Sequence, residues 1–369
     1  MLFPETNFDR PRAEFSPGRG ALNAGIAVLA FLLACAGLNA FLPFPEIDVV
    51  SLKLRFFRQH RDDFDTVFIG SSRIRHQISP AIFDRTMRQA GFPTRTFNFG
   101  INAMAPPEDG YLLQRLLGTK PRHLRWVFIE LDELQTKRIP ETENTRRSVY
   151  WHDRKRTSLL LRAILDAGHE EGGFALLRRI GELVFPGREN SEARDLLFFH
   201  GAYFAKNFTN IGRIADLSSW ISQLLKEEAL SEKLGSLGDG YVPRSRKMSV
   251  TEAAVYEAEL KQAVTETGFR FVSASTEHAY RQLAEEVRKA GATPIFLVTP
   301  LTMQIKLGFR PESGIASTMM SFNDARAYPQ LYRNEMRSDS GHLNSVAAKE
   351  FTRIVAESFS QLRRENRIQ

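Results

Sequence analysis

An uncharged, apolar run at residues 21–44 is the feature that most restricts the structure of this chain. Its length is close to the ~20 residues that a helix needs to cross a bilayer. A cleaved signal peptide has a shorter apolar core, and a lipoprotein signal would end at Cys35. Because the apolar residues continue past Cys35, we favour an uncleaved transmembrane helix. The chain then divides into a tail at 1–20, an anchor at 21–44 and a domain at 45–369.

The overall charge of the chain favours an anionic partner. The 369 residues carry a formal net charge of +7, and 43% of them are hydrophobic, which is usual for a globular protein. Basic residues lie on both sides of the anchor, so the positive-inside rule does not assign its orientation. We expect no nucleic-acid partner, because the sequence has no zinc-finger spacing, RNA-binding aromatic motif or lysine- and arginine-rich block.

The cysteine and histidine content argues against a metal or cofactor site. Cys35 is the single cysteine, so neither an intrachain disulfide nor a cysteine metal site can form. The eight histidines show no ligand-like spacing. We therefore expect no metal and no cofactor.

Strands and helices alternate along the domain on both sides of a long interruption. Apolar runs predict buried strands, and apolar residues at helical spacing predict the helices that follow them. Strands are predicted at 65–70, 94–100, 124–132 and 293–300, and helices at 79–91, 106–118, 275–291 and 344–364. This alternation predicts an α/β fold with a parallel sheet and helices on both faces.

Residues 133 to about 270 interrupt this alternation. They carry helical periodicity without a convincing strand, in stretches at 157–165, 174–185, 214–234 and 251–264. We interpret them as a helical insertion that caps the domain or binds a partner.

Polar residues with complementary chemistry occupy three short segments. Open α/β sheets place their sites at the carboxyl ends of the strands. Two of the segments follow predicted strands and the third precedes the last helix: Gly70-Ser71-Ser72, Gly100-Ile101-Asn102 and Asp339-Ser340-Gly341-His342. Gly-Ser-Ser alone is compatible with an ordinary turn or helix cap.

Together the three segments contain the groups of a serine nucleophile. A serine hydroxyl needs a base to take its proton, histidine is that base near neutral pH, and an acid fixes the imidazole tautomer. Asp339 and His342 are three residues apart, so one turn can present both to Ser72. Backbone N–H groups of Ser72 and Gly100, with the side chain of Asn102 as a third donor, would stabilise the oxyanion.

The first segment resembles the SGNH/GDSL hydrolase superfamily. The resemblance is closest to membrane-anchored members that modify polymers, namely the D-alanyl transfer protein of teichoic acid synthesis and alginate-type O-acetylation proteins. FIGSSRIRHQISP (68–80) resembles the first block of the superfamily. By this resemblance Ser72 is the nucleophile, and Ser71 occupies the usual aspartate position.

Two further blocks follow in the expected order. FNFGINAM (97–104) resembles the second block and carries its glycine, Gly100, while YPQLYRNEMRSDSGHLN (328–344) resembles the last block, Asp-x-x-His, with Asp339 and His342. The resemblance covers roughly residues 60–132 and 270–365, and the anchor besides. It implies a flavodoxin-like, three-layer SGNH fold in which Ser72, His342 and Asp339 form the catalytic triad.

The third block departs from the superfamily pattern. An asparagine is expected after the third strand, but this chain has FIELDELQ there, with Glu130 and Asp132. A carboxylate cannot donate to an oxyanion unless it is protonated. Asn102 would then substitute, or the oxyanion hole would have two donors. A less favoured interpretation makes Glu130 and Asp132 acid/base carboxylates of a glycosidase.

The resemblance implies a membrane-anchored serine esterase or O-acyltransferase that acts on a cell-envelope polysaccharide or related polymer. It also implies a single-pass protein of the inner membrane, with a periplasmic or otherwise extracytoplasmic domain in contact with the lipid bilayer. A membrane-embedded O-acyltransferase would be the partner that passes the acyl group across. The acyl donor, the acceptor and the choice between hydrolysis and transfer stay open. The alternative is a catalytically inactive scaffold of an envelope assembly that keeps the SGNH fold.

Overall fold

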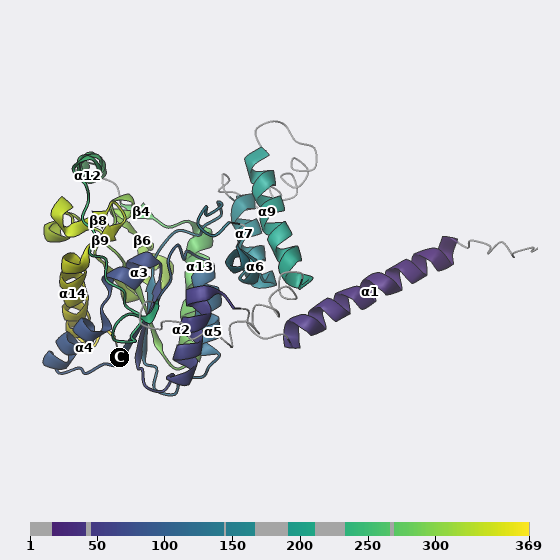
Figure 1. Cartoon of the computed structure of the whole chain (residues 1–369), viewed down its shortest axis with the longest axis horizontal. Coiled ribbons are helices and arrows are strands. Elements are labelled where there is room, and N and C mark those ends of the chain that lie inside the picture. Colours follow the sequence, from purple (N-terminus) through teal and green to yellow (C-terminus); the bar gives the residue numbers. More distant parts are fainter. Residues whose placement is uncertain are drawn as a thin grey trace, which may run out of the picture.

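A five-stranded parallel sheet forms the centre of the domain (Figure 1). The computed structural model describes residues 17–41, 46–143, 145–166, 191–210, 233–265 and 269–368. In spatial order the strands are β2 (Thr96–Gly100), β1 (Thr66–Gly70), β3 (Trp126–Glu130), β5 (Thr293–Val298) and β7 (Met319–Ser321). The first four lie inside the predicted ranges and confirm them. β7 was not predicted, because its three residues are too short for a periodic pattern.

Helices cover both faces of the sheet, as predicted. On one face lie α2 (Asp48–Gln59), α5 (Glu108–Leu117) and α13 (Ala274–Lys289), and on the other lie α4 (Pro80–Gln89) and α14 (Ser345–Arg364) (Figure 1). All but α2 confirm predicted helices. The domain is therefore an α/β structure with a parallel sheet between two helical layers.

The central strand β1 shows how the sequence builds two cores. Its side chains alternate between the faces, so Val67 and Ile69 pack beneath α2, α5 and α13, while Phe68 packs beneath α4 and α14. The ring of Phe68 stacks on Phe128 of β3 at 4.1 Å between centroids and meets Phe83 of α4 edge-on at 5.0 Å. Full burial of one such side chain contributes roughly 1.5–3 kcal/mol.

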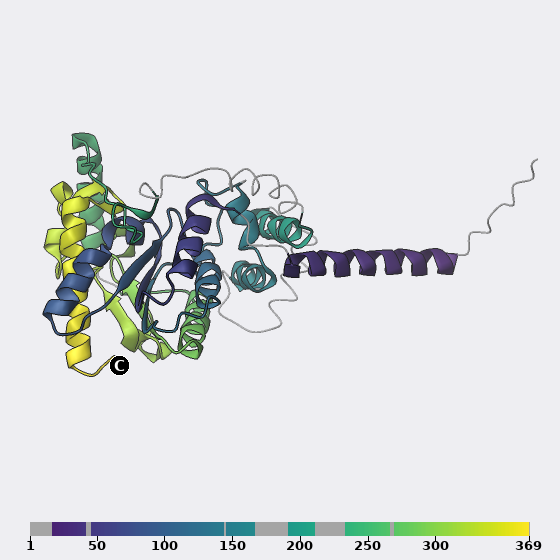
Figure 2. The same ribbon diagram turned by 60° about the horizontal axis from the view of Figure 1, so that its bottom comes forward.

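The described part of the insertion is mainly helical. It contains α6 (Arg146–Tyr150), α7 (Arg154–Asp166), α9 (Ser191–Phe208) and α12 (Val250–Thr265). α9 packs against α6 and α7, and α7 contacts α13, so these three helices lie beside the sheet domain on the side of α13 (Figures 1 and 2). α12 lies on the other side of the sheet domain, above β8 and α14 (Figure 1).

Two of the four predicted helical stretches of the insertion are confirmed. Residues 157–165 fall in α7 and residues 251–264 fall in α12. Residues 174–185 and most of 214–234 lie outside the described residues. At the far end of the predicted range, β4 (Arg270–Phe271) pairs in parallel with β6 (Leu307–Gly308), outside the main sheet.

A non-helical part of the insertion runs along the free edge of β2. The N–H of Asn98 in β2 donates to the carbonyl of Asp239 at 2.9 Å, and the N–H of Val242 donates to the carbonyl of Arg75 at 3.1 Å. Edge strands expose unpaired backbone N–H and C=O groups, and this segment provides a hydrogen-bond partner for part of the β2 edge. The prediction of a purely helical insertion missed this contact.

The remaining short elements connect the carboxyl ends of the strands. Short 3₁₀ turns occur at Thr302–Gln304, Pro311–Ser313, Ala316–Thr318, Pro329–Leu331 and Asn334–Met336. An antiparallel pair follows them, formed by β8 (Arg337–Asp339) and β9 (His342–Leu343).

The N-terminal helix α1 (Pro17–Phe41) projects away from the domain in both views (Figures 1 and 2). From Arg19 to Phe41 it is long and apolar enough to cross a membrane, with a mean hydropathy of 2.2. It begins before the predicted 21–44, and the predicted residues 42–44 lie outside the described residues. Near its end, the carbonyl of Cys35 accepts a hydrogen bond of 3.1 Å from Asn210, just beyond α9.

Candidate active site

Ser72, His342 and Asp339 form a hydrogen-bonded chain at the carboxyl edge of the sheet. Ser72 Oγ lies 2.6 Å from His342 Nε2, and His342 Nδ1 lies 2.7 Å from Asp339 Oδ1. Because Asp339 accepts the proton of Nδ1, Nε2 presents its lone pair to the serine. These are the distances that a nucleophile, a general base and an orienting acid require.

Ser72 is the first residue of the short helix α3 (Ser72–Gln77), which begins directly after β1. Ser71 is the N-cap, and its hydroxyl accepts a hydrogen bond of 3.1 Å from the N–H of Arg73. The alternative in which Ser72 is merely the helix cap is therefore wrong. The cap leaves the hydroxyl of Ser72 to face His342, and such a cap typically contributes ~1 kcal/mol.

The β8–β9 pair holds the acid and the base opposite each other. Asp339 in β8 pairs with His342 in β9 across the turn. The fully buried Arg337 donates to the carbonyl of Pro300, just after β5, at 2.9 Å, and to the carbonyl of Ser340 at 3.2 Å. Arg337 thus fixes the turn to the end of the central sheet. This strand pair was not predicted.

Arg244 is a component of the site that the sequence did not reveal. Its Nη1 donates to Asp339 Oδ2 at 2.6 Å, while the N–H of Gly341 donates to Oδ1 at 2.9 Å. Burial alone would raise the pKa of Asp339, but the hydrogen bond and charge of His342, with the charge of Arg244, lower it to about 2. Asp339 therefore stays ionised at neutral pH.

The N–H of Gly100, predicted to be an oxyanion donor, has an acceptor in this structure. It donates to Asn98 Oδ1 at 2.8 Å, and Asn98 Nδ2 in turn donates to the carbonyls of Ile74 and Ile78. A Cβ on Gly100 would lie 2.2 Å from the backbone nitrogen of Arg75 in α3. Gly100 thus allows α3 to pack directly on the end of β2, which fixes the helix that carries Ser72.

Lys53 of α2 contacts the end of β2 from the opposite face of the sheet. It is fully buried, and its Nζ donates to the carbonyls of Asn98, Gly100 and Gly240 at 2.9, 2.9 and 2.8 Å. Burial, then the charge of Arg75, lowers the pKa of Lys53 well below its usual value. In the sequence Lys53 is one of the basic residues that follow the anchor. Its position on the apolar face of α2, three residues after the buried Val50, was the available signal.

Asn102 contacts His76, whose ring lies 6.2 Å from the ring of His342 between centroids. His76 Nδ1 must donate to the carbonyl of Val242, which lies 2.6 Å away, so Nε2 of a neutral ring can only accept. Burial lowers the pKa of His76 to about 4, which keeps the ring neutral. Asn102 Oδ1 lies 3.0 Å from Nε2, and because two acceptors cannot bond, we infer that the amide is rotated by 180° and donates from its NH₂ group. One hydrogen of that group then meets Nε2, which leaves the other for a second acceptor.

Glu130 and Asp132 are bound by an arginine. Arg73 Nε lies 2.6 Å from Glu130 Oε1, and Arg73 Nη2 lies 2.5 Å from Asp132 Oδ2. Glu130 Oε2 also accepts a hydrogen bond of 2.6 Å from the N–H of Ser71. These contacts position the turn before Ser72 by charge-assisted hydrogen bonds. They leave Glu130 an acceptor rather than an oxyanion donor.

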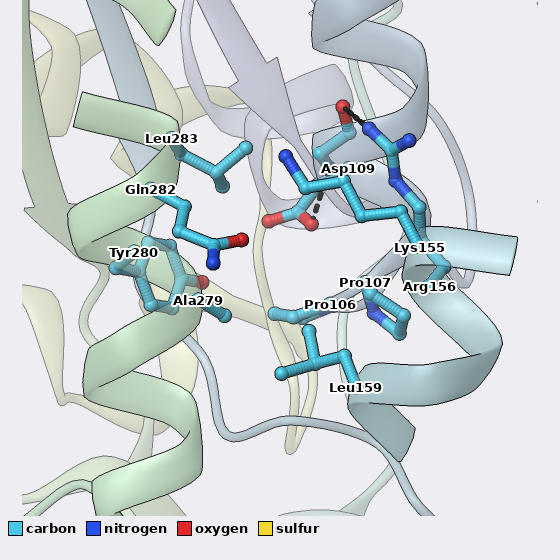
Figure 3. Close-up of a pocket in the computed structure, with 11 residues that line it drawn as sticks. Pro106, Pro107, Asp109, Lys155, Arg156, Leu159, Ala279, Tyr280, Gln282 and Leu283 are labelled. Carbon is cyan, nitrogen blue, oxygen red and sulfur yellow. Dashed lines mark hydrogen bonds between the residues drawn. The ribbon is translucent and has the colours of Figure 1, made fainter. Parts of the chain in front are cut away.

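A third acid, Asp109, lies in a small cavity behind this network. The cavity, of about 30 Å³, lies between α5, α7 and α13, and Figure 3 shows Asp109 facing Gln282 and Leu283. The carboxylate accepts a hydrogen bond of 2.6 Å from the N–H of Gly110. Burial, opposed by that bond and reinforced by nearby acids, raises the pKa of Asp109 to about 7.

Because of Asp109, the free energy of unfolding is expected to fall as the pH rises from about 4 to 7. The native state keeps the proton up to about pH 7, whereas an unfolded aspartate loses it near 3.9, so the native state binds more protons in this window. Asp109→Asn removes this cost. When the pH is raised from 5 to 8, the free energy of unfolding of the variant should rise by about 3 kcal/mol relative to that of the wild type. This estimate uses ~1.4 kcal/mol per pKa unit.

Urea unfolding at the two pH values measures this gain. Glu285→Gln is the matched control, because Glu285 is an exposed acid on α13, so this variant shows the effect of removing one surface acid. An equal pH response in the wild type and in Asp109→Asn would show that Asp109 is ionised in the native state.

No family model matches this chain, and no curated protein matches it.

Proposed function

We propose that the chain is a membrane-anchored, SGNH-type serine esterase or O-acyltransferase that acts on a cell-envelope polysaccharide or related polymer. The observation that carries this proposal is the chain from Ser72 Oγ through His342 to Asp339, with contacts of 2.6 and 2.7 Å. Its position at the carboxyl edge of a parallel sheet also supports the SGNH resemblance.

In the first step Ser72 Oγ attacks the carbonyl carbon of an acyl ester, and its proton passes to His342 Nε2. The tetrahedral oxyanion that forms would be met by the N–H of Ser72, which lies at a helix start without an intrahelical acceptor. The free amide hydrogen of Asn102 is the candidate second donor. When the tetrahedral species collapses, the departing alcohol takes the proton from His342 and leaves Ser72 acylated.

In the second step an acceptor attacks the acyl-serine ester. His342 takes the proton of water, which gives hydrolysis, or of a sugar hydroxyl, which gives transfer, and returns it to Ser72 Oγ. Asp339 orients His342 and stabilises its protonated form. Arg244, paired with the other oxygen of Asp339, keeps that carboxylate ionised and in place.

The helix α1 supports the membrane part of the proposal. Its length and hydropathy suit a single span, which would keep the active domain next to the envelope. By the same resemblance, the domain faces the extracytoplasmic side of the inner membrane, and a membrane-embedded O-acyltransferase supplies the acyl group.

Two observations favour the alternative, an inactive scaffold with the same fold. The N–H of Gly100 is engaged by Asn98, and Glu130 stands where the superfamily has a donor asparagine. In that case the helical insertion would bind partners and Ser72 would have no chemical role.

A fluorophosphonate probe separates the two functions, because only an activated serine reacts with it quickly. The full-length protein should be labelled at Ser72, as mapped by peptide mass spectrometry. Ser72→Ala should lose the label, and Ser71→Ala should keep it. A folded wild-type protein that stays unlabelled would support the scaffold.

A further inference from the structure

A groove of about 640 Å³ lies between α2 and α5 and is lined by several arginines. Arg55 and Arg58 come from α2, Arg61 comes from the turn after it, and Arg115 comes from α5. The acid among the lining residues is Glu46. Positions 55, 58 and 61 are three residues apart, so their side chains follow one face of the chain.

Part of this positive charge is not neutralised within the groove. Glu46 pairs with Arg55 at 2.7 Å. Arg115 Nη2 donates to the hydroxyl of Tyr111 at 3.1 Å and has a further partner, so the excess of charge does not depend on it. Within the described parts of the chain, the exposed Arg58 makes no hydrogen bond or ion pair and keeps its charge.

Arg61 adds to this excess. Its Nε is buried and, among the described residues, has no hydrogen-bond acceptor. The nearest carboxylate, Asp62, lies 4.0 Å away and is held more closely by Arg122, at 2.7 Å. The hydrogen bonds of Arg122 lower the pKa of Asp62 to about 2. The charge of Asp62 is therefore shared mainly with Arg122, which does not line the groove.

The groove begins close to the end of the anchor helix. Glu46, which lines it, comes five positions after Phe41, the last residue of α1. Five extended residues reach at most about 17 Å. A headgroup layer is roughly 5–7 Å thick, and charges act over about 8 Å at physiological salt. A bilayer crossed by α1 would therefore bring its headgroups within reach of these arginines.

We propose that this groove binds the phosphate of an anionic phospholipid headgroup from the membrane that α1 enters. The planar guanidinium group matches phosphate oxygens with two parallel hydrogen bonds. The bound lipid would hold α2 against the bilayer. Lys53 in the same helix donates a hydrogen bond to the carbonyl of Gly100, so α2 also contacts the end of β2 on which α3 packs. This inference rests on the membrane anchoring proposed above and is independent of the esterase chemistry.

The test uses the full-length protein in uncharged detergent micelles and follows its unfolding temperature. Short-chain phosphatidylglycerol should raise this temperature in a saturable way, because a ligand that binds only the native state stabilises it. Phosphatidylcholine and inorganic phosphate at equal concentration should have little effect. The variant Arg58→Gln/Arg61→Gln should bind phosphatidylglycerol at least tenfold more weakly, and Arg58→Gln alone about fivefold more weakly, from the ~1 kcal/mol expected per arginine.

The matched control is Arg85→Gln/Arg88→Gln on α4. These two exposed arginines have the same spacing and the same charge, but α4 lies on the opposite face of the sheet. The control should bind phosphatidylglycerol as the wild type does. Equal weakening in both double variants, or an equal response to phosphatidylcholine, would overturn the proposal. An equal response to inorganic phosphate would replace the lipid with a free anion.

Two further measurements keep the outcome clear. If Arg58→Gln/Arg61→Gln unfolds early without lipid, Arg58→Gln decides, because Arg58 is exposed and makes no hydrogen bond or ion pair with the described residues. The wild-type protein must also stay in membranes after carbonate extraction. Its release would remove the basis for a lipid site while leaving the fluorophosphonate result intact.

Discussion

Ser72→Ala and His342→Ala are each expected to lower acyl-ester turnover by about 10⁴-fold or more, and the double variant should be little worse. In the proposed mechanism the two residues act as one unit, because Ser72 Oγ would be activated through its contact of 2.6 Å with His342 Nε2. Once either residue is lost, the other has no remaining role in the proton transfer. The measurement is hydrolysis of a model acetyl ester by the full-length protein, with circular dichroism as the check on folding.

Ser71→Ala is the matched control for this pair. Its hydroxyl caps α3 and has no contact with His342, so its loss should cost about 1 kcal/mol of stability and less than tenfold in turnover. Full activity in a folded Ser72→Ala variant, or loss of activity in Ser71→Ala instead, would mean that the nucleophile is assigned to the wrong serine. If no variant changes turnover, the scaffold function is the better account.

Asp339→Asn is expected to keep the fold but lower turnover by up to about 10⁴-fold, as in serine proteases with the equivalent change. The two oxygens of Asp339 accept hydrogen bonds from His342 and Gly341 on one side and from Arg244 on the other. An amide has only one oxygen. Its NH₂ group must face either the guanidinium of Arg244 or the ring of His342, and the second choice moves the imidazole proton to Nε2.

Arg244→Gln tests the contact between Asp339 and Arg244 separately from the contact between Asp339 and His342. This variant keeps the carboxylate of Asp339 and its bond to His342, so turnover should fall by roughly tenfold, from the loss of ~1.5 kcal/mol of charged hydrogen bonding. The pH dependence of turnover should keep its shape in Arg244→Gln. Turnover within tenfold of the wild type in Asp339→Asn would show that the carboxylate does not orient His342.

Local pattern was sufficient for the parts of the fold that are long and regular. β1, β3 and β5 come from near-continuous apolar runs, because both faces of a parallel sheet are covered, and such runs are visible without a structure. β2 instead alternates Phe97 and Phe99 with the polar Thr96 and Asn98. The three-residue spacing of Asp339 and His342 was likewise local, so one turn could be predicted to present both.

The features that could not be predicted from the sequence depend on contacts between distant segments. Arg244 lies in the insertion, and nothing near it in the chain indicates a carboxylate partner at position 339. The engagement of Gly100 by Asn98 depends on where α3 packs, which a single sequence does not encode locally. β8 and β9 are too short for any periodicity, so only their pairing defines them as strands.

The separation of 270 residues between Ser72 and His342 has a consequence during synthesis. At roughly 5–20 residues per second, the histidine leaves the ribosome about 10–60 seconds after the serine. Throughout that interval the nascent chain carries Ser72 without its base, so the hydroxyl is no more reactive than any other. The base and its acid arrive together, immediately before the last helix α14 (Ser345–Arg364). If Ser72 is the nucleophile, a chain that ends before His342 would have no base for it, and reactivity would appear only after the β8–β9 pair has packed on α3.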